Sequence, residues 1–279
     1  MPNSSCTVQS NAKINLCLRI TGRLENGYHS LSSLFQEIDL HDTLTFTEAN
    51  SFSLSCNDNT IPCDSRNLCS IAYQKMKSLV PDSKDWHIQL RKRIPVGAGL
   101  GGGSSNAAVV LKFLNTHWNI KMSQSELVRM ASQIGADVAF YLHGGTQLAE
   151  GIGDILTPLN LPENFTLLLI CPPILISTPW AYQQFNLTKR KTGYKFRDLF
   201  ESGRIHWELF ENQFESVVFP AYPEIGAIKS RLQQTGAIYA GLSGSGSTVF
   251  GTFINRHEAE IARQLFIDNT SFLSLPIIQ

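Results

Sequence analysis

The sequence predicts an α+β protein of two domains. The chain has 279 residues, 43% of them hydrophobic, which is enough for substantial cores. Strand-like alternation and helical spacing of apolar residues occur in both halves, as expected for helices packed on mostly antiparallel sheets. A change of composition at residues 156–164 separates the halves. We therefore expect domains at 1–157 and 158–279.

The first half predicts strands and helices that lead into a glycine-rich loop. Apolar residues alternate or cluster as in strands, and recur at helical spacing between strands. Ser104 or Ser105 is placed to cap the helix after the loop, Ser123 and Glu126 predict a capping box, and Gly135 is expected to end that helix. The predicted strands are 7–20, 31–49, 51–57 and 86–96, and the predicted helices are 67–80, 104–118 and 123–135.

The second half predicts a buried strand, two helices and a strand pair joined by a glycine-rich turn. Residues 165–170 are continuously apolar apart from one threonine, as in a buried strand. Residues 222–236 read as a helix that Gly236 ends, and residues 257–267 as a last helix. Residues 236–254 predict strand, turn and strand.

Charge and cysteine content exclude several classes of function. Lys plus Arg and Asp plus Glu number 23 each, so the net charge is zero and no basic excess favours nucleic acid or a membrane surface. No secretory signal or membrane-spanning run is visible, and none of the six cysteines forms a C-x-x-C pair. We expect a cytoplasmic protein with free thiols, no zinc site and no obligate protein partner.

The glycine-rich segment 95–105, "PVGAGLGGGSS", predicts a cradle for nucleotide phosphates. It joins an alternating strand to an apolar helix, which a mobile linker would not do. Gly97-x-Gly99-x-x-Gly102 matches the dinucleotide fingerprint, but the acidic residue expected about 20 positions later is absent. The lysine of a Walker loop is absent too. Backbone N–H groups at a helix start still suit phosphates.

Several motifs together resemble the GHMP kinase superfamily. "PVGAGLGGGSSNAA" is similar to its second motif, and "AGLSGSGSTVF", residues 240–250, to its third. Residues 11–42, 135–142 and 149–159 resemble the branch that phosphorylates the 2-hydroxyl of 4-diphosphocytidyl-2-C-methyl-D-erythritol in the non-mevalonate isoprenoid pathway. The resemblance implies an ATP-binding N-terminal domain and a smaller, ferredoxin-like α/β-sandwich C-terminal domain.

The resemblance also implies roles for individual residues. Asp137 is the expected base, and Lys13 the residue that orients the groups and stabilises charge. Tyr28, Phe35 and Tyr182 match aromatic walls around cytosine, and His29 can bond the edge of the base. Further matches are Asn15, Thr178 and Pro179 for the cytidine diphosphate substrate, and Asn67, Leu68 and Lys92 around adenine. The ATP phosphates are assigned to Pro95, Val96, Gly97, Ala98, Gly99, Leu100, Gly101, Gly102, Gly103, Ser104 and Ser105.

Two departures and two rival hypotheses accompany this resemblance. Ala139 stands where the family usually has proline, and Asn11 lies where a proline usually precedes Ala-Lys. ATP chemistry implies Mg²⁺, but we assign no protein ligand to a metal because no carboxylate cluster has suitable spacing. The rivals are another GHMP kinase, acting on a mevalonate derivative or homoserine, and a non-catalytic nucleotide- or RNA-binding module.

Overall fold

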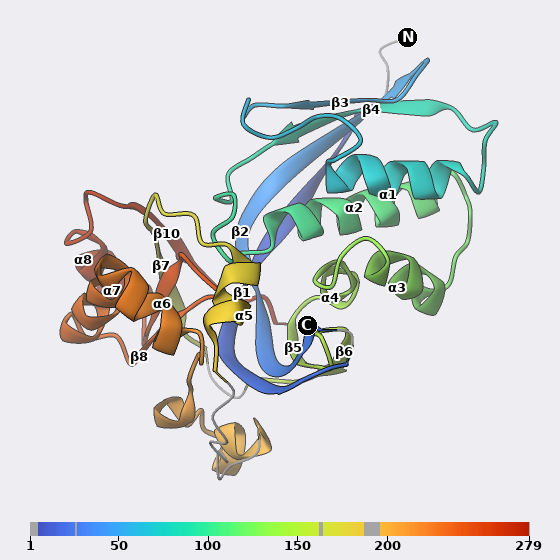
Figure 1. The fold of residues 1–279 in the computed structure, drawn as a ribbon. Helices are drawn as coiled ribbons and strands as arrows, with labels where there is room; N and C mark the ends of the chain where they lie inside the picture. Colours follow the sequence, from blue (N-terminus) through green and yellow to red (C-terminus); the bar gives the residue numbers. More distant parts are fainter. Residues whose placement is uncertain (1–4, 26, 162–163, 187–195, 279) are drawn as a thin grey trace. The chain divides into compact units, whose positions relative to one another are not determined.

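A computed structural model describes residues 5–25, 27–161, 164–186 and 196–278 (Figure 1). Its α-helices and β-strands confirm the α+β class. The expected composition break at 156–164 includes residues 162–163, which lie outside the described ranges. Within those ranges, no helix is long and apolar enough to cross a membrane.

The contacts divide the chain into two compact units that do not follow chain order. Two long strands, β1 (Ser5–Arg23) and β2 (His29–Ala49), run through both units, so a single cut in the sequence cannot separate them. The expected boundary at 157/158 therefore differs from the division by contacts, and it stays a prediction. The first unit comprises Met1–Ala12, His41–Val96 and Gly101–His143, and the second comprises Lys13–Leu40, Gly97–Leu100 and Gly144–Gln279.

In the first unit, helices pack beside a small sheet. β4 (Asp85–Arg91) pairs antiparallel with the end of β2 and parallel with β3 (Ser53–Cys56). Helix α1 contacts α2, and α4 contacts both α2 and α3 (Figure 1). Stacked rings of Phe46 and Phe113, with centroids 3.7 Å apart, join sheet to helix in the core. The helices are α1 (Leu68–Lys77), α2 (Gly102–His117), α3 (Gln124–Ser132) and α4 (Val138–His143).

The helix ends confirm one predicted cap and correct two. The capping box of Ser123 and Glu126 at α3 is present. Helix α2 begins earlier than predicted: Gly101, with φ 68°, is its N-cap, so Ser104 and Ser105 lie inside its first turn rather than capping it. Gly135 lies beyond the C-cap, Gln133, and does not adopt the left-handed conformation. The presence of a glycine at position 135 permits a left-handed φ but does not require it.

The second unit contains a four-stranded antiparallel sheet in the order β10-β7-β9-β8. Helices α6 and α7 lie between β7 and β8 in sequence, and α8 lies between β9 and β10. Together with this strand order, that is the ferredoxin-like β-α-β-β-α-β arrangement (Figure 1). The elements are β7 (Thr166–Cys171), α6 (Glu215–Ala221), α7 (Pro223–Gln234), β8 (Tyr239–Leu242), β9 (Val249–Phe253), α8 (Arg256–Arg263) and β10 (Thr270–Ser274).

The remaining elements of this unit are a strand pair and short helices. β5 (Thr146–Glu150) pairs with the first part of β2 and with β6 (Ile155–Pro158), and α5 (Thr178–Gln184) follows β7. Two 3-10 helices, Phe196–Gly203 and Trp207–Leu209, precede α6. Gly236, with φ 93°, follows the end of α7 as predicted. Strands β5, β6 and β10 were not predicted from the sequence.

Candidate functional site

Lys13 lies in a buried polar spot on β1. Only 4% of its surface is exposed, and its Nζ donates to Asn15 Oδ1 at 2.6 Å. Residues two apart on a strand face the same side, which is why this lysine and asparagine meet. The ammonium also lies 4.5 Å from the centre of the Phe35 ring on β2. A buried cation needs compensating partners, and here the Asn15 amide oxygen accepts a hydrogen bond while the Phe35 ring face attracts the charge.

Asn15 extends this polar spot to the neighbouring strand. Its Nδ2 donates to Ser33 Oγ at 2.9 Å, and that hydroxyl donates to the Cys17 carbonyl at 2.7 Å. The structure thus brings Lys13, Asn15 and Phe35 together. Phe35 is buried against Lys13, and its expected contact with a base stays a prediction.

The glycine-rich loop has the backbone of an anion-binding concavity. Gly97, Gly99 and Gly101 have φ of 68°, 78° and 68°, whereas the intervening residues have negative φ. Such alternation turns successive N–H groups toward one side, as in anion-binding nests. Gly99 also lies close to the backbone of the later glycine-rich turn, residues 243–247 between β8 and β9. A Cβ added at Gly99 would lie only 2.2 Å from the Ser243 carbonyl oxygen.

At the start of α2, a buried ion pair supports the end of the loop. Lys92 Nζ donates to Asp42 Oδ2, and Asn106 Nδ2 donates to the same oxygen at 3.0 Å. Asp42 Oδ1 accepts the N–H groups of Arg93 at 2.7 Å and Ile94 at 2.9 Å, where β4 passes into the loop. A Cβ on Gly102 would lie 2.9 Å from Lys92 Nζ.

The residues expected near adenine lie beside the same helix start or cap the adjacent helix. The Leu68 side chain is 3.7 Å from the position of a Cβ on Gly103. Asn67 is the N-cap of α1, and its Oδ1 accepts from Cys69 N at 2.9 Å. The buried Ser105 hydroxyl accepts from Ser10 Oγ at 2.7 Å. In the first unit, the structure thus brings Leu68 and Lys92 to the first glycines of α2.

An aromatic group in the second unit joins two of the predicted substrate residues. His29, at the start of β2, stacks on Tyr182 of α5, with ring centroids 4.9 Å apart and planes 18° apart. Tyr28, which directly precedes His29 in sequence, is 61% exposed and follows Gly27, with φ 86°. Burial, and then the nearby charge of Arg23, lower the pKa of His29 from 6.5. The ring is therefore neutral at neutral pH.

Thr178 lies at the first turn of α5, where Ser177 caps the helix. The Thr178 hydroxyl bonds to the Ser245 hydroxyl at 2.7 Å, which links α5 to the later glycine-rich turn. Pro179 occupies an early helical position that tolerates proline, because no N–H donor is needed there. The predicted substrate residues of α5 are thus fixed by a cap and a side-chain bond.

Asp137 belongs to the first unit, in the turn between α3 and α4. It is half-buried and directly precedes α4, whose residues Val138 and Ala139 are fully buried. The structure gives its place within that unit, and its proposed action with Lys13 of the second unit stays a prediction. Ala139, which replaces the usual proline, is accommodated in a regular helical turn.

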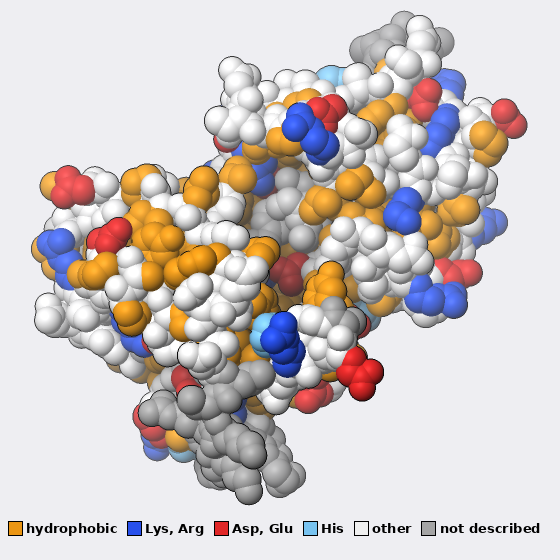
Figure 2. Space-filling view, in the orientation of Figure 1, with side chains coloured by type: hydrophobic (Ala, Val, Ile, Leu, Met, Phe, Trp, Pro, Cys, Tyr) orange, Lys and Arg blue, Asp and Glu red, His pale blue; other side chains and the backbone are white. Residues whose placement is uncertain are grey.

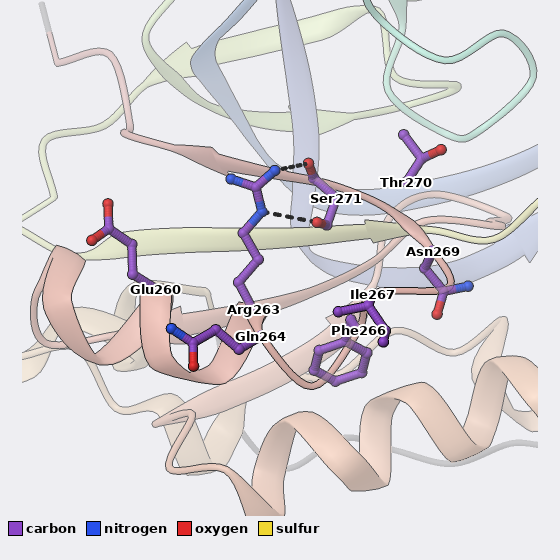
Figure 3. A pocket seen from close by; sticks show the side chains of 8 residues that line it. All are labelled: Glu260, Arg263, Gln264, Phe266, Ile267, Asn269, Thr270 and Ser271. Atoms are coloured by element: carbon purple, nitrogen blue, oxygen red, sulfur yellow. Dashed lines mark hydrogen bonds between the residues drawn. The ribbon is translucent and has the colours of Figure 1, made fainter.

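A separate pocket of about 500 Å³ lies next to α8 and β10 (Figure 3). Arg263 is its one cationic lining residue, and it donates to the Ser271 hydroxyl at 3.0 Å and the Ser271 carbonyl at 3.1 Å. No predicted site residue lines this pocket. Among the residues that the structure describes, no group of three or more His, Cys, Asp and Glu side chains could hold a metal ion.

Comparison with known proteins tests the resemblance. The family models described as "GHMP kinases N terminal domain" and "GHMP kinases C terminal" match residues 67–145 and 196–266. The 4-diphosphocytidyl-2-C-methyl-D-erythritol kinase of Chlorobium limicola is 42% identical over 262 residues, 92% of this chain and 91% of the relative.

The chain belongs to the GHMP kinase family. The kinase of the same name from Prosthecochloris aestuarii is 42% identical over 266 residues, 93% of each chain. A crystal structure of 4-(cytidine 5'-diphospho)-2C-methyl-D-erythritol kinase matches with a TM-score of 0.84 at 29% identity, over 97% of this chain and 99% of that chain. The predicted fold and kinase class are confirmed. This GHMP kinase is a small-molecule kinase with ATP as its phosphate donor.

Two groups of supporting residues in this GHMP kinase were not identified from the sequence. Asp42 and Asn106 hold Lys92 below the start of α2. Asn212 holds the later glycine-rich turn, since its Nδ2 donates to the carbonyls of Leu242 at 2.7 Å and Gly244 at 2.8 Å. Asn106, directly after the loop serines, was the available signal for the first group. Asn212 lies where the motif resemblance is thin and gave no signal.

Proposed function

We propose that this GHMP kinase transfers the γ-phosphoryl group of ATP to the 2-hydroxyl of 4-diphosphocytidyl-2-C-methyl-D-erythritol, in the non-mevalonate isoprenoid pathway. ADP is the second product, and the acceptor hydroxyl loses its proton. Relatives that carry this kinase's name and share 42% identity over most of the chain support the choice of acceptor. The reaction takes place in the cytoplasm, in keeping with six free cysteines.

The stacked rings of His29 and Tyr182 are the structural observation that favours a cytosine-bearing acceptor. Aromatic faces bind nucleobases by stacking, and a neutral imidazole can bond the edge of a base. The exposed Tyr28 ring, one residue before His29, supplies a further face. Mevalonate derivatives and homoserine carry no base to stack, so an aromatic group of this kind would serve them poorly.

The chemistry rests on two charged side chains. Asp137 accepts the proton of the acceptor hydroxyl, which makes the oxygen a better nucleophile. Lys13 orients the reacting groups and stabilises negative charge that develops during transfer. The half-buried place of Asp137 before α4 and the buried place of Lys13, whose ammonium is held by Asn15, support these roles.

The phosphates of ATP are held by backbone N–H groups of the loop 95–105 and by the start of α2. The left-handed glycines fit this role because side chains are kept away from the concave backbone. Leu68 and the aliphatic part of Lys92 border the adenine, together with Asn67 at the cap of α1. The Lys92 ammonium stays with Asp42. Mg²⁺ accompanies ATP, with phosphate oxygens and water as its main ligands.

A panel of acceptors tests this function directly. Wild-type protein is incubated with ATP and, separately, with the cytidine acceptor, mevalonate phosphate and homoserine, and ADP release is followed. We expect turnover with the cytidine acceptor alone. Phosphorylation of only one of the other two would favour a different GHMP kinase, and no turnover at all would favour a nucleotide-binding module. The interspersed charges on the face in Figure 2 do not form the basic stripe that RNA binding would need.

Two substitutions test the assigned chemistry. Asp137→Asn is expected to lower kcat by about a hundredfold to ten-thousandfold, because the base is lost. Lys13→Ala is expected to lower it by roughly a hundredfold or more, because charge stabilisation is lost. Asp154→Asn, in the turn before β6, and Lys77→Ala, which loses a pair with Asp85, are the matched controls. Near-normal rates for Asp137→Asn or Lys13→Ala would remove that residue from the mechanism.

A further inference from the structure

Ser243 is a fully buried serine whose hydroxyl bonds to two segments of the proposed site. It follows β8 directly and has 0% exposure. Its Oγ donates to the Gly99 carbonyl at 2.9 Å and accepts the N–H of Asn15 at 3.3 Å. One hydroxyl therefore joins the glycine-rich loop to the strand that carries Lys13.

The bond to Gly99 is one of three that hold successive loop carbonyls. Thr248 N donates to the Ala98 carbonyl at 3.2 Å, and Lys13 N donates to the Leu100 carbonyl at 3.0 Å. In a trans peptide, the carbonyl and the next N–H point in opposite directions. Fixing these three carbonyls therefore aims the three following N–H groups away from their donors. Ser243 supplies the middle bond, and the only one of the three made by a side chain.

The backbone around Ser243 is itself held in place. Asn212 donates to the carbonyls on either side of it, and Asn212 Oδ1 accepts from Phe214 N at 3.0 Å. Ser243 N donates to the Thr248 carbonyl at 2.9 Å. Because the turn is anchored on both sides, the Ser243 hydroxyl is a fixed point against which the loop and β1 are set.

The bond to Asn15 extends this support toward the charged side chain. Asn15 N is held by Ser243, and Asn15 Oδ1 accepts from Lys13 Nζ. We propose that Ser243 is a positioning residue that keeps the Lys13 ammonium and the N–H groups of the phosphate loop in a fixed relation, through Asn15 N and the Gly99 carbonyl. This inference rests on the proposed function of the loop and Lys13.

The test compares two serines of the same turn. Ser243→Ala removes both hydrogen bonds. Ser247→Ala is the control, because Ser247 is also buried, at 1% exposure, and its hydroxyl donates to the Pro172 carbonyl at 3.3 Å. We expect Ser243→Ala to raise the Kd of a non-hydrolysable ATP analogue and to lower kcat, each by about tenfold. Ser247→Ala should leave both within twofold.

Two further readouts separate positioning from a general loss of stability. The Kd of the cytidine acceptor should rise by less than the Kd of the ATP analogue in Ser243→Ala, because Tyr28, His29 and Tyr182 are outside this set of bonds and Asn15 loses only one backbone bond. The two alanine variants should have similar thermal midpoints. If Ser243→Ala does not fold, Ser243→Cys replaces it, because a thiol keeps the approximate size and is a poorer donor.

Equal effects of Ser243→Ala and Ser247→Ala on kcat would overturn the proposal, as would an unchanged analogue Kd in Ser243→Ala. Analogue binding is measured without any acceptor. Failure of the wild type to phosphorylate the cytidine acceptor would therefore sink the proposed function and leave this comparison readable.

Discussion

The glycine-rich loop and the aromatic group of Tyr28, His29 and Tyr182 differ in whether main-chain or side-chain atoms form the binding surface. The loop, residues 95–105, uses main-chain groups, and its shape depends on left-handed glycines and on bonds to its carbonyls. The aromatic group uses side chains, with His29 and Tyr182 stacked at 4.9 Å. The loop therefore cannot accept an added Cβ at Gly99, where it lies closest to the Ser243 carbonyl. In the aromatic group, by contrast, a ring can be replaced by another side chain without moving the backbone.

This difference matters for how each region serves phosphoryl transfer. Phosphates carry the same charge in every nucleoside triphosphate, so backbone donors are sufficient to hold them. An acceptor is chosen by its particular shape, and side-chain rings provide that choice. We expect changes in the loop to affect ATP and changes in the aromatic group to affect the acceptor.

Gly99→Ala is expected to have the largest effect. The left-handed φ of 78° costs a residue with a side chain roughly 1–2 kcal/mol, and the added Cβ would lie 2.2 Å from the Ser243 carbonyl oxygen. The backbone must shift, and displacement of a catalytic site by about 1 Å costs on the order of a hundredfold in rate. We expect kcat/KM for ATP to fall by about that factor, measured at saturating acceptor.

Gly103→Ala is the matched control in the same loop. Gly103 is exposed, lacks a left-handed φ, and its added Cβ would meet only the Leu68 side chain, at 3.7 Å. Alanine favours the helix by about 1 kcal/mol, so the thermal midpoint should rise. A stability loss in Gly103→Ala, or none in Gly99→Ala, would contradict this account of the loop.

Tyr182→Leu is expected to have an intermediate effect, confined to the acceptor. Leucine keeps an apolar contact with Phe214, whose ring lies 4.9 Å from that of Tyr182, but removes the stacking face. Base stacking contributes about 1–3 kcal/mol, so KM for the cytidine acceptor should rise by roughly tenfold or more, with KM for ATP unchanged. Trp180→Leu in the same helix should leave both constants near normal. A rise in KM for ATP in Tyr182→Leu would count against the division of roles.

The smallest expected effect is a pH dependence set by His29. Its folded pKa lies below 6.5, mainly because of burial. The unfolded chain gains the proton near pH 6.5 and the folded chain only at lower pH. The stability contributed by neutral His29 is therefore present above that pH and is lost as pH falls below it. KM for the acceptor should be flat from pH 8 to 6.5 and rise only below 6.5.

His29→Gln should remove that rise, because glutamine does not titrate. The comparison of the two profiles isolates His29 from the titration of other groups, such as the terminal phosphate of ATP. A rise in the wild-type KM that is centred above pH 6.5 would show that the His29 pKa is not lowered, as would an unchanged rise in His29→Gln.

The sequence predicted much of this molecule where a local pattern decides the structure. The capping box of Ser123 and Glu126 and the glycine after α7 depend on neighbouring residues alone, and both are confirmed. The predicted start of α2 was wrong because Gly101, in a left-handed conformation, is the N-cap, which leaves Ser104 and Ser105 inside the helix. The loop before Gly101 is held by Ser243 and Thr248, which are distant in sequence, so no local pattern reveals these bonds.

The supporting residues of the site were hidden for the same reason. Asp42 lies 50 residues before Lys92, and Ser243 lies 144 residues after Gly99. No spacing rule links such pairs. Lys13 and Asp137 could be named because a family pattern marked them. The burial of Phe35 against Lys13 could not be anticipated. An aromatic residue on a strand gives the same sequence pattern whether its ring faces a ligand or a neighbouring ammonium.

The most direct test of this account is to measure two binding constants on two variants. The Kd of a non-hydrolysable ATP analogue and the Kd of the cytidine acceptor are each determined by calorimetry for wild type, Gly99→Ala and Tyr182→Leu. A loop that binds phosphates through its backbone predicts weaker analogue binding in Gly99→Ala with unchanged acceptor binding, and the reverse in Tyr182→Leu. Equal losses of both ligands in either variant, or no loss in both, would contradict the claim that main-chain and ring-built regions bind different substrates.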